Sequence, residues 1–327
     1  VELIKMSTDG QVATTLSAAR QAVTQKGAKF IGAVMTSPEH AALNKLLPSL
    51  GALSLNSLGQ DESLIGKNCS KNAFHIVQSD DMNVTAVAKG LKAMPGKKWA
   101  ILTEDYSTGH SAAAAFAKAV KKAGKQVVST QFAPLNTTEF GPFITKIENS
   151  GADAVFSGEY GADGVAFVNQ AAQFGLTKKV GTVLGLNMVS EPLFPVLGNK
   201  VVGFYNNVGY NVHADNAQNK KFVQDYTKQF GSAPYYVPAD NYLAAETLFA
   251  GIKKAGSVDP AKVGAALDGL TLPSVDGNVR MRAADHQLIR PNFLGKVVKT
   301  PKGLAFKIVD SMTGPETSPA ANPDCHM

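Results

Sequence analysis

The sequence predicts an α/β protein of two lobes, each built on a parallel sheet flanked by helices. Short apolar runs alternate with longer amphipathic stretches along most of the 327 residues, and parallel βαβ units require this order. The alternation restarts after residues 75–82, HIVQSDDM, which indicates a second lobe of similar architecture. A chain of this length is too long for one small domain and suits two lobes.

The first series of elements covers residues 1–56. Strand-like runs and helix-like runs follow one another as βαβαβ, which predicts a parallel sheet with helices on both faces. Gly27 is the expected cap at the end of the first helix. Ser37 is the expected N-cap of the second helix, with Pro38 at its first position. The strands are expected at residues 1–6, 28–35 and 52–56, and the helices at 11–27 and 37–51.

The second series follows the same order. Strands are expected at residues 99–105, 126–133, 152–158 and 179–186, and helices at 111–124, 140–151 and 164–175. A third section begins at residues 201–210, with helices expected at 216–231 and 240–256 and short β segments at 278–283, 292–300 and 303–311. The tail, residues 313–327, is rich in Pro, Ser and Asn and is typical of an extended strap.

Composition excludes two classes of protein. The net charge is +6, but the lysines are scattered and no block of five or six basic residues occurs, so the sequence does not indicate nucleic-acid binding. No run of 18 or more apolar residues occurs, so no transmembrane helix is predicted. The chain opens abruptly, and we expect its true start and any export signal to precede residue 1.

Ligands of open parallel sheets bind at the carboxyl ends of the strands, and this rule selects candidate residues from the loops. The start of a helix after Ser37 favours an anion by about 0.3–1 kcal/mol, although Ser37 can also simply cap its own helix. Tyrosines after the strands offer ring faces to a ligand, although each can equally be packing. The candidates are Thr36, Ser37, Asn56, Ser57, Tyr106, Thr108, Glu159, Tyr160, Asn187, Met188 and Tyr210.

An enzyme is one class of protein to which the candidate residues could belong, and the absence of catalytic motifs argues against it. Six histidines are scattered, and no HExxH, GxSxG, GxxxxGK[ST] or GxGxxG motif occurs. His40 falls on a helix near the candidate site, where we expect a solvated residue. We therefore expect no catalytic residue, no metal ion and no cofactor.

The chain has two cysteines, Cys69 and Cys325, in neither a CxxC nor a metal-type spacing. They are either two unrelated buried thiols or one disulfide, and a disulfide would require an oxidising compartment. The residues alone leave both open.

Several segments resemble type I periplasmic binding proteins of the leucine/isoleucine/valine-binding group. The resemblance covers nearly the whole chain. It implies two Rossmann-like lobes joined by a three-strand hinge, and a periplasmic solute-binding component of an ABC importer. It also implies a small-molecule ligand, a membrane permease as partner and a monomer. The segments are residues 28–43, 63–91, 99–116, 152–176 and 216–252.

Within that group the chain is similar to the branch that binds aromatic compounds such as benzoate derivatives. The similarity lies in the segment GKNCS, followed by an aromatic residue and a polar run, and in the chain end Cys325-His326-Met327. The resemblance implies that Cys69 and Cys325 are disulfide partners, and that the ligand carboxylate binds at the hydroxyl position of Ser57.

The resemblance also implies the lobe boundaries. Lobe one is residues 1–76 and 209–288, without the first strand and helix of other members. Lobe two is residues 77–208 and 289–327, including the C-terminal strap. The crossings are expected near 75–78, 207–210 and 284–291, and closure of this hinge on a ligand would stabilise the closed state.

The expected class of ligand follows from the absence of an acidic residue at one position of the sequence. Amino-acid binders of this group place an acidic residue after the last lobe-two strand, where this chain has residues 185–188, GLNM. Burying an ammonium without a countercharge costs several kcal/mol, so we expect a carboxylate ligand without an ammonium, with Met188 packed on its ring. Glu159 or Asp163 could supply the charge, which keeps hydrophobic amino acids as the alternative. A receptor ectodomain is the alternative of another class.

Overall fold

The computed structural model describes residues 2–327, which form two compact units. Unit 1 comprises the chain up to Ser79, Tyr210–Pro291 and Ser318–Met327, and unit 2 comprises Asp80–Gly209 and Asn292–Thr317. The chain therefore passes from one unit to the other four times, at 79/80, 209/210, 291/292 and 317/318. From the sequence we had placed the last ten residues with lobe two, whereas they belong with unit 1.

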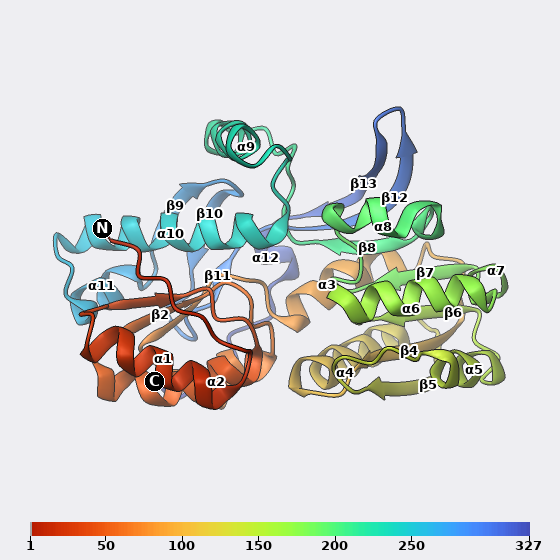
Figure 1. The fold of residues 1–327 in the computed structure, drawn as a ribbon, viewed down its shortest axis with the longest axis horizontal. Helices are drawn as coiled ribbons and strands as arrows, with labels where there is room; N and C mark the ends of the chain where they lie inside the picture. The colour runs from red at the N-terminus through yellow and green to blue at the C-terminus, as the bar shows by residue number, and fades with distance from the viewer. Residues whose placement is uncertain (1) are drawn as a thin grey trace. The chain divides into compact units, whose positions relative to one another are not determined.

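Unit 1 contains a three-stranded parallel sheet in the order β1-β2-β3, with Ile31 opposite Ser54 and Leu55 opposite Phe74. Helices α1 and α2 cover one face and α10 and α11 the other (Figure 1). Its elements are α1 (Val12–Thr24), β1 (Phe30–Gly32), α2 (Ser37–Leu50), β2 (Leu53–Asn56), η1 (Glu62–Ile65), β3 (Ala73–His75), α9 (Ala217–Phe230), α10 (Tyr236–Ala255), α11 (Pro260–Leu267), β9 (Thr271–Ser274), β10 (Gly277–Met281) and β11 (Leu288–Ile289).

Unit 2 contains a seven-stranded sheet in the order β13-β12-β8-β7-β6-β4-β5, in which β12 and β13 run antiparallel to their neighbours. Helices α3 and α4 pack on one face, and α5, α6 and α8 on the other. Its elements are α3 (Asp80–Leu91), β4 (Lys98–Glu104), α4 (Ser107–Lys122), β5 (Gln126–Ala133), α5 (Gly141–Asn149), β6 (Ala154–Ser157), α6 (Gly161–Gln173), α7 (Leu176–Lys179), β7 (Thr182–Gly185), η2 (Glu191–Leu193), α8 (Phe194–Leu197), η3 (Gly198–Val201), β8 (Tyr205–Val208), β12 (Asn292–Thr300), β13 (Gly303–Met312) and α12 (Gly314–Thr317).

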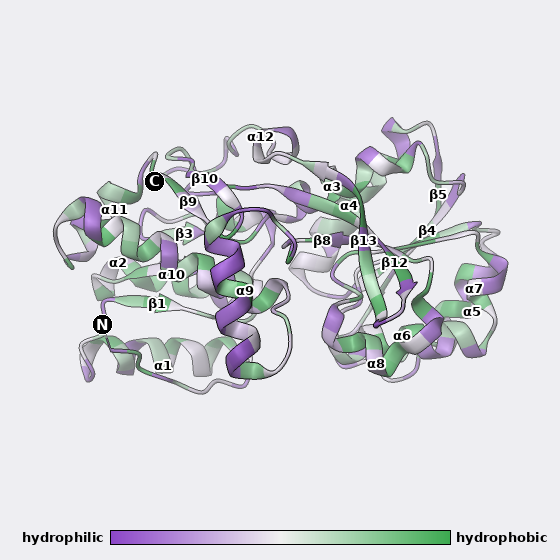
Figure 2. Cartoon of the chain, turned by 90° about the horizontal axis from the view of Figure 1, so that it is seen from above, coloured by the Kyte–Doolittle hydropathy of each residue, from purple (hydrophilic) through white to green (hydrophobic). Residues whose placement is uncertain are grey.

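The hydropathy of β4 explains why this strand is buried on both faces of the sheet. Along β4, Trp99 and Ile101 belong to one core cluster, and Ala100 and Leu102 to the cluster on the opposite face. Successive side chains of a strand point to opposite faces, so a strand that is apolar at every position is buried on both. Helix α9 differs: Figure 2 shows hydrophilic residues over most of its length, and within it Asn219 and Phe222 are the buried positions.

Two predicted details at the start of the chain are wrong. Among the described residues, Glu2–Met6 forms no strand, and Leu3 is 79% exposed, so this apolar run has neither a pairing partner nor a core to enter; Val1 lies outside the described residues. Helix α2 begins one residue earlier than expected, with Thr36 rather than Ser37 as its N-cap.

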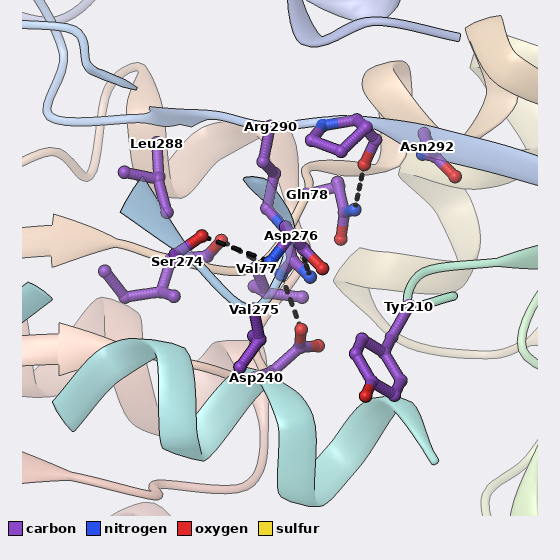
Figure 3. A network of polar contacts seen from close by, with 12 residues as sticks. Val77, Gln78, Tyr210, Asp240, Ser274, Val275, Asp276, Leu288, Arg290 and Asn292 are labelled. Carbon is purple, nitrogen blue, oxygen red and sulfur yellow. Dashed lines mark hydrogen bonds and ion pairs between the residues drawn. The ribbon is translucent and has the colours of Figure 1, made fainter. Parts of the chain in front are cut away.

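A buried ion pair network organises unit 1 (Figure 3). The Arg290 side chain is fully buried between Asp240 of α10 and Asp276 of the β9–β10 turn. Its Nε lies 2.6 Å from Asp276 Oδ2, and one Nη contacts Asp240 Oδ1. Beside it, the Gln78 amide donates to the carbonyl oxygen of Pro291 at 3.0 Å. One cation thus compensates two carboxylates inside the unit.

We expect Arg290→Met to destabilise the protein strongly, because two buried carboxylates would lose their cation, at a cost of about 3–5 kcal/mol. Urea unfolding measures this change. Arg280→Met, at an exposed position of β10, is the matched control and should change the unfolding free energy by less than about 0.5 kcal/mol. Equal stability of the two variants would contradict the assignment.

Candidate functional site

In unit 1 the candidate residues follow β1 and β2, whose carboxyl ends lie at the same edge of the sheet because the strands are parallel. The backbone N–H and the hydroxyl of Thr36 both donate to the carboxylate of Glu39 at 2.7 Å, which caps α2. Ser37 is buried, and its Oγ accepts the backbone N–H of Asp61 at 3.3 Å. Thr36 and Ser37 therefore shape the start of α2.

Asn56 ends β2, Ser57 follows it, and both are buried. The Asn56 amide oxygen accepts the N–H of Gly59 at 2.8 Å, and its Nδ2 lies 2.8 Å from His75 Nδ1. Asn56 thus holds its own loop and the neighbouring strand. The Ser57 hydroxyl donates to the amide oxygen of Asn241, on α10, at 2.8 Å.

His40 is not the solvated residue that we expected: its side chain is fully buried, with Nε2 at 3.1 Å from the carbonyl oxygen of Val34. Burial lowers the pKa of His40 to about 4 and that of His75 to about 3. The expectation of a solvated His40 is wrong because η1 and the loop after β2 cover this face of α2: a Cβ on Gly59 would lie 2.7 Å from the His40 ring.

In unit 2 two tyrosines occupy equivalent places at the carboxyl edge of the sheet. Tyr106 is the N-cap of α4 after β4, and Tyr160 is the N-cap of α6 after β6. Their hydroxyls lie 3.3 Å apart. Thr108, in the first turn of α4, interacts with the Tyr106 hydroxyl, and burial raises the pKa of Tyr106. The structure therefore brings together three of the predicted residues.

Two glycines set where these helices begin. A Cβ on Gly109 would lie 2.0 Å from the carbonyl oxygen of Glu104, and one on Gly164 would lie 2.7 Å from that of Glu159. No side chain fits at such distances without a shift of the backbone. Each glycine thus lets a helix start directly against the end of its strand, which fixes the tyrosine at the N-cap.

A group of buried carboxyls lies at the same edge. Glu104 ends β4, Glu159 follows β6, and Asp163 lies in the first turn of α6; Glu104 and Glu159 are at most 2% exposed. Burial raises the pKa of Glu104 to about 8, and burial with the charges of Glu104 and Asp163 raises that of Glu159 to about 9. Glu104 is not among the candidates predicted from the sequence, although a carboxylate at the end of an apolar strand could have indicated it.

The remaining candidates have internal roles. Asn187 follows β7 with φ of 55°, and its backbone N–H donates to Asn207 Oδ1 at 2.7 Å. Met188 is fully buried in the core of unit 2. Tyr210 is buried in unit 1, where its hydroxyl donates to Asn219.

The two cysteines form a disulfide within unit 1, as the resemblance implied. Over residues 2–327 we find no group of three His, Cys, Asp or Glu side chains able to hold a metal ion. Within the same range no helix is both long enough and apolar enough to cross a membrane.

The fold is that of type I periplasmic binding proteins. It superposes on a solute-binding protein of an ABC transporter from R. palustris, solved with 4-hydroxybenzoate, with a TM-score of 0.88, 24% identity and coverage of 98% of this chain and 86% of that chain. The leucine-, isoleucine-, valine-, threonine- and alanine-binding protein of Brucella ovis, in its closed conformation, gives a TM-score of 0.86 at 20% identity, with coverage of 98% and 86%.

The chain belongs to the family described as Periplasmic binding protein, whose model matches residues 1–302. One relative is the Leu/Ile/Val-binding protein homolog 6 of Brucella melitensis, 26% identical over 297 residues, which are 88% of this chain and 75% of the relative. Proteins of this family bind substrates for ABC transporters and are not enzymes.

The buried histidines make acid stability testable. The unfolded chain binds protons on these histidines near pH 6.5, whereas folded His40 and His75 resist protonation down to about 4 and 3. Below pH 6.5 the unfolded state therefore binds more protons than the folded state. The free energy of unfolding consequently decreases as the pH is lowered. For His40 the loss is about 3 kcal/mol by pH 4.

Urea unfolding between pH 7 and pH 4 measures this dependence. His40→Gln removes one titrating group and should flatten the curve. Parallel curves for wild type and His40→Gln would show that His40 does not titrate in this way.

Proposed function

We propose that this protein is the solute-binding component of an ABC importer and captures a small aromatic carboxylate, such as a benzoate derivative. The observation that carries the proposal is the pair of tyrosines at one sheet edge of unit 2, with hydroxyls 3.3 Å apart. Tyrosine rings bury large apolar area while their hydroxyls remain able to bond a polar substituent, and both properties suit a substituted aromatic ring.

The carboxylate is assigned to unit 1. The start of α2 presents the positive end of a helix dipole, and Ser57 lies at the end of the neighbouring strand. We propose that Ser57 exchanges its Asn241 acceptor for the ligand carboxylate, because hydrogen bonds to charged acceptors are stronger than neutral ones. We propose hinge closure, which the family resemblance implies, as the means of capture.

The loop after β7 supports a ligand without an ammonium. Asn187 is uncharged there, and its side-chain oxygen accepts from the Asn207 amide at 3.0 Å. Solved structures of similar fold come from proteins crystallised with 4-hydroxybenzoate and with 3,4-dihydroxybenzoic acid. These ligands carry a carboxylate and no amine.

A hydrophobic amino acid is the second candidate. Relatives named as Leu/Ile/Val-binding protein homologues favour it, and the Glu159 carboxyl could face an ammonium. The two candidates differ by one charge on the ligand, so binding measurements separate them.

We further propose that the protein works in the periplasm, as a monomer, with a membrane permease as its partner. The Cys69–Cys325 disulfide supports an oxidising compartment, and the family supports the partner.

We expect aromatic carboxylates to raise the melting temperature and leucine to have little effect. A ligand at about 100 times its dissociation constant adds roughly 2.7 kcal/mol to stability. A thermal-shift panel of benzoate, hydroxybenzoates, hydroxycinnamates, phenylacetate and branched-chain amino acids measures this. Benzyl alcohol, which lacks the carboxylate, is the matched control. Stronger stabilisation by leucine than by every aromatic acid would overturn the ligand class.

Ser57→Ala should weaken binding of the best aromatic acid about tenfold or more, because a hydrogen bond to a charged group contributes about 1.5–3 kcal/mol. Isothermal titration calorimetry gives the affinity. Ser49→Ala, at a serine whose hydroxyl bonds only its own helix in unit 1, should bind like wild type. Unchanged affinity of Ser57→Ala would remove the carboxylate from this position.

A further inference from the structure

Glu159 is a fully buried carboxyl of unit 2. Its side chain is 0% exposed, and within the described range 2–327 neither carboxyl oxygen has a hydrogen-bond partner. Buried polar groups are nearly always paired, and leaving one unpaired costs free energy. The position is the carboxyl edge of the sheet, between β6 and the N-cap of α6.

Glu104 adds a second carboxyl at the same place. Strands β4 and β6 are parallel neighbours, with Leu102 opposite Ser157. A Cβ on Gly158 would lie 3.5 Å from Glu104 Oε2, so the Glu104 carboxyl rests against the backbone just before Glu159. Its Oε1 has no partner among the residues that the structure describes.

The groups that act electrostatically on this pair are acidic or neutral. They are Asp163 of α6, the hydroxyls of Tyr106 and Tyr160, and the backbone of Tyr160, whose hydrogen bond to Glu104 lowers the pKa of that carboxyl by less than burial raises it. Asp163 accepts the backbone N–H of Asn136, from the loop after β5, at 2.8 Å. The loop after β7 contributes the uncharged Asn187. Two adjacent buried carboxyls without a cation cannot both be ionised at low cost.

We propose that Glu159, supported by Glu104, acts as a neutral carboxylic acid that donates a hydrogen bond to an uncharged oxygen substituent of the ligand. A protonated carboxyl has one O–H donor, which a phenol, ether or carbonyl oxygen accepts. An ammonium offers only donors, so it would face a donor and bind only after a proton is released. The acid would thus select oxygenated aromatic acids over amino acids, and this specificity role rests on the proposed function.

The pKa values agree with this geometry. They lie at about 8 for Glu104 and about 9 for Glu159, above neutral pH. Because glutamine has the shape and donor capacity of a protonated glutamate, Glu159→Gln imitates the proposed state, whereas Glu159→Ala removes the donor.

Calorimetric titration with 4-hydroxybenzoate tests the donor. At pH 7, Glu159→Gln should bind within about threefold of wild type, and Glu159→Ala should bind at least about tenfold more weakly. From pH 7 to pH 10 the wild type should lose affinity relative to Glu159→Gln. This ratio cancels the ionisation of the ligand itself. Glu148→Gln, at the last turn of α5, is the control for loss of a carboxyl and should match wild type.

Thermal unfolding without ligand tests the protonation separately. Above pH 4.5 the unfolded chain ionises this carboxyl while the folded chain does not, so the wild type loses stability as pH rises toward 9. The melting temperature of Glu159→Gln should therefore exceed that of wild type by a margin that grows from pH 4 to pH 9.

The outcomes separate the two proposals. If 4-hydroxybenzoate binds wild type but Glu159→Gln fails to bind at pH 7, the carboxyl acts as a carboxylate and this inference is wrong, while the proposed function stands. If no aromatic acid binds wild type and leucine does, with loss in Glu159→Gln, both are wrong. A melting-temperature margin that is constant with pH overturns the inference whatever the ligand.

Discussion

The candidate site depends on one constraint: parallel strands that share a sheet end at the same edge, and the helix after each strand must begin there. In unit 2 this constraint is tightened by Gly109 and Gly164, where a side chain would overlap the carbonyl oxygens that end the strands. Tyr106 and Tyr160 consequently fall at matching helix starts and meet through their hydroxyls. The close approach of backbone to backbone places the two tyrosines, and the contact between their hydroxyls joins them.

The two units treat buried charge differently. In unit 1 the buried carboxyls of Asp240, Asp276 and Asp285 each bond to an arginine, and burial still raises the pKa of Asp240 to about 7. At the edge of unit 2, Glu104 and Glu159 receive no cation from the residues described in the structure. Strongly shifted pKa values in such a setting are typical of functional sites.

The sequence predicted most elements because their hydrophobic periods are clear; residues 126–133 and 292–300 coincide with β5 and β12. Helix α3 was missed because Val84 and Val87 are β-branched and disfavour a helix locally, whereas in the structure both are buried in the core cluster that α3 shares with α4. Helix α11 was missed although Asp259 is its N-cap and Pro260 its first residue. This pair of residues is typical of the start of a helix.

The carboxyl-end rule located Tyr106, Tyr160 and Glu159 correctly at the edge of a sheet, because it depends only on strand order. It could not distinguish Met188 and Tyr210, which follow strands equally closely but turn into the cores of their units. It also gave no indication that His40 is covered, since that depends on packing by the loop at Gly59. Strand positions are encoded locally, whereas the direction of a loop side chain depends on tertiary contacts.

The disulfide closes the chain into a covalent ring. Cys69 and Cys325 are separated by 256 positions, and all of unit 2, Asp80–Gly209 and Asn292–Thr317, lies between them. A protease that cuts once inside this ring does not release a fragment, because both pieces stay attached through the sulfur atoms. Damage to a loop of unit 2 would therefore leave one covalent molecule until a reductant reaches the bridge.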